Sequence, residues 1–147
     1  MEGYLISFLK EKITLYSMEP SRITFEILEN ITIFKNSKKI TQQLNELRGM
    51  GFKIAIDDFG IENSNFGRLL EINIDFIKLD GIFIKNLKHN KRNRTITKAI
   101  VNLAKTLKIE TVAEFVEDEE VYEIVKECGI DYAQGYYIGK PEASLIS

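Results

Sequence analysis

Charged and amide side chains interrupt every apolar segment that predicts a buried strand. Strands covered on both faces read as nearly continuous apolar runs, so a charged residue within one needs a physical reason. The interrupting residues are Glu26, Asp57, Asp58, Lys78, Asp80, Glu114, Glu117 and Gln134. Because the carboxyl ends of parallel strands meet at one edge of a sheet, we expect these side chains to converge on one site.

The adjacent carboxylates of Asp57 and Asp58 indicate a metal site. Each would raise the pKa of the other unless cations offset the repulsion. Carboxylate ligands suit Mg²⁺ or Mn²⁺, and a pair of such ions about 3.5 to 4 Å apart is a common device for phosphodiester hydrolysis. Lys78 would then supply positive charge near a phosphate. For any single residue, the alternative is a strand-end carboxylate that caps a helix or pairs with a lysine.

Strands and helices that alternate along the chain would position these residues. Apolar runs rich in Ile, Val and Phe predict five strands, at Arg22–Leu28, Phe52–Ile56, Phe76–Leu79, Thr111–Val116 and Tyr132–Ile138. Helical spacing predicts one helix from Leu5, Phe8, Leu9 and Ile13, and others around Leu44, Ile100 and Ile124. This order predicts a parallel sheet with helices outside it, and both a barrel and an open sheet satisfy it.

Composition limits the classes of partner and compartment. With 147 residues and 44% hydrophobic residues the chain suits one domain, and its net charge of -2 predicts no non-specific binding of DNA or RNA. The single Cys128 forms no internal disulfide, and no apolar run approaches the ~20 residues of a membrane span. We therefore expect a cytoplasmic protein without a membrane segment.

Two further segments allow more than one interpretation. The charged run at residues 88–94 predicts a solvated loop or a helix start, with phosphate binding as the alternative, and His89 within it is expected at the surface. Tyr136 and Tyr137 predict either a stacking surface for a guanine or ordinary packing, and both alternatives stay open.

Five motifs in order resemble the EAL domains of cyclic di-GMP phosphodiesterases. They read FEILE at 25–29, IDDFG at 56–60, DFIKLD at 75–80, AEFVE at 113–117 and QGYYIGKP at 134–141, which spans nearly the whole chain. The resemblance implies an α/β fold, an incomplete TIM-like barrel of about five parallel strands alternating with helices and preceded by an N-terminal helix. Residues 1–147 would form a partial EAL domain. The implied reaction is hydrolysis of cyclic di-GMP to pGpG with two Mg²⁺ or Mn²⁺ ions.

The resemblance also assigns roles to individual residues. Glu26 would bind the first metal, Asp57 would bridge both metals, and Asp58 with Glu114 would bind the second. Lys78 would contact the metal-bound water or the phosphate, and Gln134 would hold the water network or the ligand. The implied catalytic residues are Lys78, Glu114, Glu117 and Gln134. Glu29 would brace the loop after Asp58. Asp80 and Glu117 would support the site.

The chain departs from the family pattern at three places. The Glu-Ala-Leu signature and the Asn motif that follows it have no counterpart, so we expect half of the first metal's ligands to be missing. Residues 61–65 replace a Thr-Gly-Tyr-Ser-Ser-like stretch, and Phe115 replaces the usual glycine. We therefore expect this isolated chain to be inactive.

The expected partners are cyclic di-GMP and either a second copy or a chain that supplies the missing strands. One alternative function is a catalytically inactive regulatory module that binds cyclic di-GMP or dimerises. A more distant alternative is another metal-dependent TIM-barrel enzyme that uses Lys78 for proton abstraction.

Overall fold

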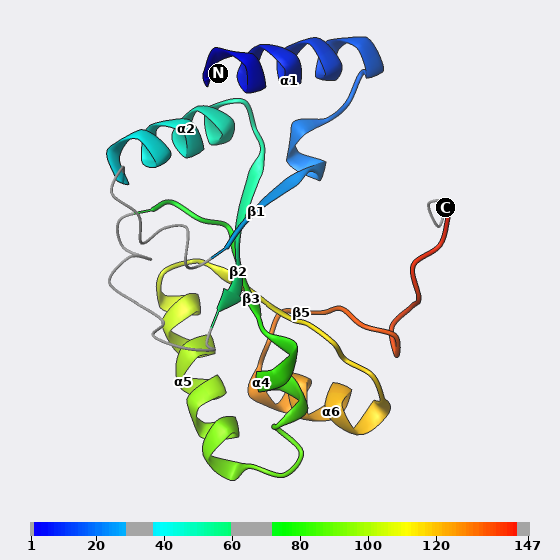
Figure 1. Ribbon diagram of the computed structural model, residues 1–147. Coiled ribbons are helices and arrows are strands. Elements are labelled where there is room, and N and C mark those ends of the chain that lie inside the picture. The colour runs from blue at the N-terminus through cyan, green and yellow to red at the C-terminus, as the bar shows by residue number, and fades with distance from the viewer. Residues whose placement is uncertain (1, 29–36, 60–71, 144–147) are drawn as a thin grey trace.

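A parallel five-stranded sheet, in the order β1-β2-β3-β4-β5, forms the centre of the fold (Figure 1). The computed structural model describes residues 2–28, 37–59 and 72–143. Its strands are β1 (Thr24–Leu28), β2 (Lys53–Phe59), β3 (Phe76–Leu79), β4 (Glu110–Ala113) and β5 (Tyr132–Ala133). The helices in this part of the chain are α1 (Glu2–Tyr16), the 3-10 helix η1 (Pro20–Arg22), α2 (Ser37–Gly49), α4 (Gly81–Lys85), α5 (Lys91–Thr106) and α6 (Glu119–Cys128). The predicted α/β fold, with five parallel strands alternating with helices after an N-terminal helix, is confirmed.

The observed limits differ from the sequence prediction at four of the five strands. The third strand matches its predicted limits. The first begins at Thr24 because residues 20–22 form η1, and the second continues through both aspartates to Phe59. The fourth strand ends at Ala113 because Phe115 adopts a left-handed φ of 53°. The fifth ends at Ala133, before the turn that begins at Gly135, so its predicted end at Ile138 was wrong.

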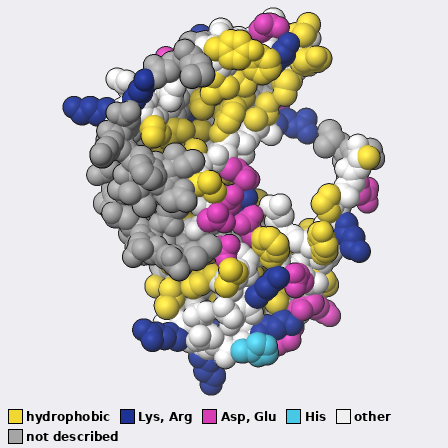
Figure 2. All heavy atoms as spheres, in the orientation of Figure 1, with side chains coloured by type: hydrophobic (Ala, Val, Ile, Leu, Met, Phe, Trp, Pro, Cys, Tyr) yellow, Lys and Arg dark blue, Asp and Glu magenta, His cyan; other side chains and the backbone are white. Residues whose placement is uncertain are grey.

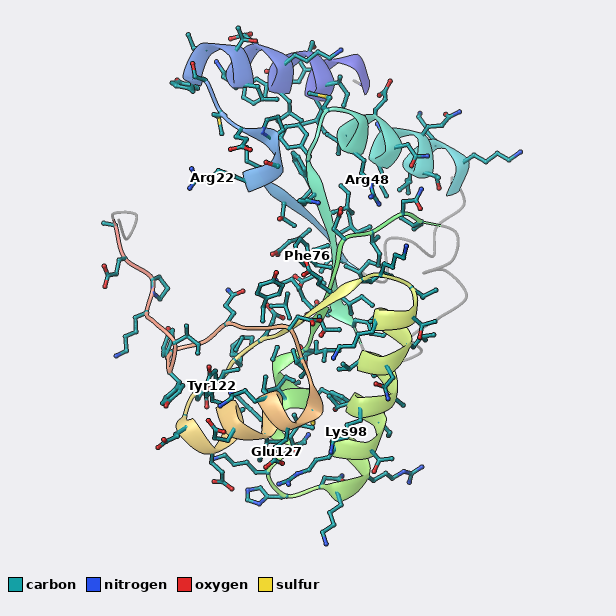
Figure 3. The ribbon with its side chains drawn as sticks, turned by 180° about the vertical axis from the view of Figure 1, so that it is seen from behind. Arg22, Arg48, Phe76, Lys98, Tyr122 and Glu127 are labelled. Carbon is teal, nitrogen blue, oxygen red and sulfur yellow. The ribbon has the colours of Figure 1, made fainter. Side chains whose placement is uncertain are left out.

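Alternation along β2 and β3 separates a packed face from a face that carries the polar residues. Ile54 and Ile77 are 0% exposed and belong to one apolar core with residues of α5 and α6 such as Val101 and Val125. The register pairs Glu26 with Ala55 and Ala55 with Phe76, so the opposite face continues from β1 to β3. Figure 3 shows Phe76 near the middle of the sheet, and its ring meets that of Tyr132 edge-on at 6.0 Å.

Helix caps set the positions of the loops around the sheet. The Asp118 side chain accepts a hydrogen bond from the Val121 backbone N–H at 3.0 Å where α6 begins, and α6 ends at Cys128, followed by its C-cap Gly129 with φ of 77°. The Asn90 side chain caps α5, which confirms the predicted helix start in the segment 88–94, and His89 is exposed as predicted.

The predicted N-terminal helix is present as α1, and it packs against the core through part of its apolar side. Ile6, Leu9 and Ile13 pack against the core, whereas Leu5 and Phe8 are 45% and 40% exposed. None of the helices that the structure describes has the length and apolar character to cross a membrane.

Candidate active site

The Lys78 ammonium group lies at the centre of the polar face. Its Nζ is 3.0 Å from Glu26 Oε2, 3.0 Å from Asp57 Oδ1 and 2.9 Å from Glu114 Oε1. Burial of the side chain, which is 9% exposed, would lower its pKa, but the carboxylates of Glu114, Glu26 and Asp57 more than offset this and raise the pKa. Lys78 is therefore a fixed positive charge at neutral pH.

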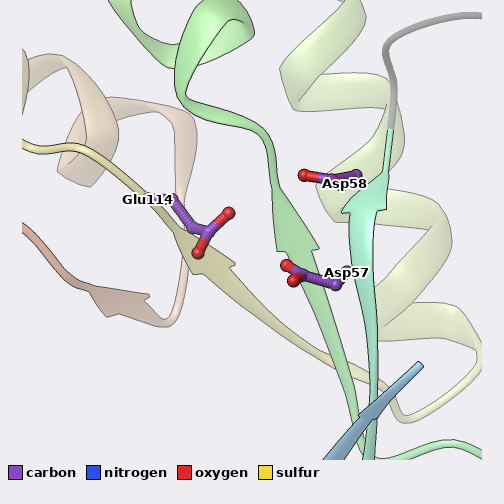
Figure 4. Close-up of side chains that lie close together, drawn as sticks. All are labelled: Asp57, Asp58 and Glu114. Atoms are coloured by element: carbon purple, nitrogen blue, oxygen red, sulfur yellow. The ribbon is translucent and has the colours of Figure 1, made fainter. Parts of the chain in front are cut away.

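Three carboxylates converge beside this lysine (Figure 4). One oxygen from each of Asp57, Asp58 and Glu114 lies within 4.8 Å of the other two. Neighbouring residues of a regular strand point to opposite faces, but the register of β2 shifts between Ile56 and Phe59 and Asp58 adopts a left-handed φ of 58°. This irregularity allows the adjacent aspartates to join one cluster.

The carboxylates of Asp57, Asp58 and Glu114 lie close enough to repel one another, and a bound cation would reduce this repulsion. Burial, followed by the charges of Asp57 and Asp80, raises the pKa of Asp58. Burial also raises the pKa of Glu114, although Lys78 acts in the opposite direction. Asp57 Oδ1 is buried, and apart from its ion pair with Lys78 it accepts no aligned hydrogen bond from the described residues. These three carboxylates therefore suit a hard divalent cation.

Two open cavities adjoin the cluster, and Figure 2 shows acidic side chains gathered in the hollow at the middle of the molecule. The first, of about 340 Å³, is lined by Thr24, Glu26, Ala55, Phe76, Lys78, Val112, Tyr132 and Gln134. The second, of about 300 Å³, is lined by Glu114, Phe115, Glu117, Gln134, Gly135 and Tyr136. Gln134 thus lies between the lysine and the loop that follows β4.

The two neighbouring tyrosines have different surroundings. The Tyr137 ring lies 5.5 Å from the Tyr122 ring of α6, and Tyr137 is 43% exposed. The Tyr136 ring is 66% exposed and lines the second cavity. Of the two tyrosines, Tyr136 is the one that lines this cavity.

The remaining expected site residues make peripheral contacts. Asp80 is buried, and its Oδ1 accepts a hydrogen bond from the Ile82 backbone N–H at 2.7 Å as the N-cap of α4. Glu117 is exposed and pairs with Lys85 at 2.9 Å. Glu29 and the loop at residues 61–65 lie outside the described residues.

Sequence reasoning missed α4 and its contribution to this region. Lys85 Nζ lies 5.3 Å from the centre of the Phe115 ring, besides its ion pair with Glu117. The available signal was Phe115 itself, an aromatic residue between the two glutamates of the segment 113–117.

Comparison with known proteins identifies the family. The sequence model of the EAL domain family matches residues 1–141 of this chain. The chain belongs to the EAL domain family. Among curated proteins it is 37% identical over 138 residues to the cyclic di-GMP phosphodiesterase PdeB of Shewanella oneidensis, an alignment that covers 94% of this chain and 16% of PdeB. This confirms the predicted family.

Solved EAL structures share the fold. The PaMucR phosphodiesterase in complex with c-di-GMP has a TM-score of 0.83 and 32% identity, over 93% of this chain and 55% of that one. The Klebsiella pneumoniae BlrP1 manganese/cy-diGMP complex has a TM-score of 0.82 and 27% identity, over 89% of this chain and 33% of that one. These neighbours are TIM-barrel-like EAL domains, so the fold class is confirmed, while the chain spans little more than half of the PaMucR structure.

Proposed function

We propose that this chain supplies the second metal site and part of the ligand-contacting surface of a cyclic di-GMP phosphodiesterase, which hydrolyses cyclic di-GMP to pGpG. The observation that carries the proposal is the convergence of Asp57, Asp58 and Glu114 beside Lys78 in an EAL domain chain. The c-di-GMP complex of the similar PaMucR phosphodiesterase supports the same ligand here.

The proposed metal is Mg²⁺ or Mn²⁺, held by Asp57, Asp58 and Glu114, and the manganese complex of BlrP1 supports this choice. Glu26, which also contacts Lys78, would contribute with Asp57 to the first metal site. A bound divalent cation supplies positive charge for the phosphate and makes a water molecule more acidic. The carboxylates of this chain hold that charge in place and balance it when the phosphate is absent.

In the proposed mechanism Lys78 binds a phosphate oxygen. Its ammonium group is protonated, nearly buried and in contact with three carboxylates, so a phosphate oxygen would replace one of these carboxylates when a metal ion binds it. Water is largely excluded from this side chain, which strengthens its interaction with a phosphate relative to the same contact in bulk solvent.

The second cavity would take one base of the dinucleotide. Phe115 and Tyr136 are 54% and 66% exposed and both line it. Stacking of a nucleobase on an aromatic side chain contributes about 1 to 3 kcal/mol per base. Glu117 and Gln134, which line the same cavity, would accept or donate hydrogen bonds at the edge of the base.

Self-association is part of the proposal. Tyr4, Leu5, Phe8, Leu15 and Tyr16 leave an exposed apolar surface on α1, and β1 and β5 are the edges of the described sheet. Exposed sheet edges and apolar patches favour pairing with another chain. A cytoplasmic location is likewise proposed, supported by the free, buried thiol of Cys128.

Ligand binding and product formation by the wild-type chain and by Glu114→Gln test this function. Calorimetry with cyclic di-GMP and Mn²⁺ measures affinity, and chromatography measures pGpG. Glu123→Gln on the exposed face of α6 is the matched control. We expect Glu114→Gln to weaken Mn²⁺ binding and the control to leave it unchanged. Binding without pGpG even after a complementing EAL segment is added would favour the inactive regulatory module, and failure to bind cyclic di-GMP would contradict the proposal.

A further inference from the structure

Gly81, the first residue of α4, lies directly against Phe115 in the loop after β4. A Cβ atom placed on Gly81 would lie 2.6 Å from Phe115 Cγ and 2.9 Å from Phe115 Cβ, and closer still to Cδ2. Rotation about the Cα–Cβ bond of Phe115 can move Cγ and Cδ2 but leaves Cβ in place. An alanine at position 81 therefore requires a shift of the backbone at Phe115 or at position 81 itself.

The Phe115 backbone is itself strained and fixed by its neighbours. Its φ of 53° is unfavourable for a bulky side chain and persists only where the surroundings determine it. The Glu114 N–H donates to Leu79 O at 3.2 Å, and the Val116 N–H donates to Gln134 O at 3.0 Å. Any shift at Phe115 is thus transmitted directly to Glu114, which precedes it.

The short helix α4 holds this loop at more than one point. Besides the contact at Gly81, Lys85 lies 5.3 Å from the centre of the Phe115 ring and 2.9 Å from Glu117 Oε1. Because α4 follows β3 almost immediately, these contacts fix the end of the strand that carries Lys78 relative to the loop that carries Glu114. Lys78 and Glu114 are in contact at 2.9 Å.

We propose that Gly81 and Phe115 are a coupled pair of positioning residues that fixes the Glu114 carboxylate against Lys78 and the two aspartates. The inference rests on the proposed function, since it takes Glu114 as a metal ligand. In this chain, phenylalanine at position 115 requires glycine at position 81, because the ring and its Cβ occupy the space that any side chain at 81 would need.

A compensating set of variants tests the coupling. Mn²⁺ affinity and the thermal midpoint are measured for Gly81→Ala alone, and for Gly81→Ala combined with Phe115→Gly or with Phe115→Ala. We expect Gly81→Ala to weaken Mn²⁺ binding about 10-fold, and Phe115→Gly to restore it to within about threefold, as contacting residues are coupled. Phe115→Ala keeps the Cβ atom 2.9 Å away and should restore binding only in part. Gly49→Ala is the control, because its Cβ would meet no atom within 4 Å.

The outcomes separate this inference from the proposed function. Unchanged Mn²⁺ affinity in Gly81→Ala, together with loss of affinity in Glu114→Gln, would overturn the coupling and leave the proposed function standing. Unchanged affinity in Glu114→Gln would overturn the proposed function instead. Where Gly81→Ala prevents folding, Phe115→Gly must restore both the thermal midpoint and Mn²⁺ binding, and failure to restore them overturns the coupling.

Discussion

The Lys78 ammonium group lies 2.9 Å from Glu114 Oε1, a contact that joins β3 to the loop after β4. The register pairs Lys78 with Val112, so Glu114 reaches the lysine from beyond the end of β4. Glu26 and Asp57 complete the lysine's surroundings from β1 and β2. The Lys78 ammonium group therefore links β1, β2, β3 and the loop after β4. Two of the carboxylates that it contacts, those of Asp57 and Glu114, are also ligands of the proposed metal.

The first prediction follows from this sharing. Replacing Lys78 by Gln removes a positive charge from the carboxylate cluster, so we expect Mn²⁺ to bind more tightly, by roughly 3- to 10-fold. The same variant should bind cyclic di-GMP more weakly, because a phosphate loses its cation. Calorimetry with each ligand measures both effects. Lys88→Gln is the control, since Lys88 pairs with Asp118 and Glu120, away from the cluster. Weaker Mn²⁺ binding in Lys78→Gln would contradict this interpretation.

The second prediction concerns Asp57 and Asp58. The double variant Asp57→Asn, Asp58→Asn removes two of the three clustered carboxylates, and we expect Mg²⁺ or Mn²⁺ affinity to fall at least about 10-fold. Titration calorimetry decides the outcome. The adjacent pair Glu119 and Glu120 on α6 provides a matched double variant with the same change in charge, which should leave affinity unaltered. Equal affinities in the wild type and the aspartate variant would sink the metal site.

The third prediction separates capping from catalysis at Asp80. Its carboxylate accepts the Ile82 N–H at 2.7 Å, and asparagine can make the same hydrogen bond. We expect Asp80→Ala to lower the free energy of unfolding by about 1 kcal/mol, and Asp80→Asn to lower it far less. Urea denaturation measures both values. A large loss of Mn²⁺ affinity in Asp80→Asn, with stability retained, would show a direct role at the site.

Different physical rules allowed the fold and the convergence of the polar site residues to be predicted from the sequence. Alternating apolar runs and helical periods determine element order, so five parallel strands could be predicted from composition and spacing alone. Convergence of Glu26, Lys78 and Glu114 followed from the shared edge of parallel strands. Their individual roles came from the family resemblance, since spacing indicates only a carboxylate-rich face.

Features that depend on tertiary contacts could not be predicted. The rule of alternation places Asp57 and Asp58 on opposite faces, and the irregularity in β2 that unites them depends on its pairing with β3. The left-handed backbone at Phe115 likewise depends on hydrogen bonds to residues distant in sequence. Strand ends at Ala113 and Ala133 were mispredicted because apolar residues continue beyond them in the sequence.

The fourth prediction concerns assembly. The exposed apolar side chains of α1 include Leu5, Phe8 and Leu15, and covering them with a second chain would remove apolar area from water. We expect light scattering to show self-association that rises with concentration. The variant Phe8→Lys, Leu15→Lys should reduce it, whereas Lys10→Glu in the same helix should not reduce it comparably. A compact monomer at high concentration would refute the proposed assembly.

The final prediction is that this chain alone does not hydrolyse cyclic di-GMP at a rate typical of its family. Among the described residues, a single group of three carboxylates lies close enough to hold one cation, and Glu26 is not part of that group. The chain also contains no Glu-Ala-Leu signature to complete the first metal site. Catalysis by two metals requires both ions in place, and misplacement by ~1 Å can cost on the order of 100-fold in rate.

The assay for this prediction follows pGpG by chromatography with Mn²⁺ present. It is repeated after the N-terminal segment of an EAL domain, carrying the missing signature, is added as a separate polypeptide. Activity that appears only with this segment, and disappears again in Glu114→Gln, would support a site divided between two pieces of one domain. Robust turnover by the chain alone would show that the residues present here suffice, and the proposed need for a second set of ligands would be wrong.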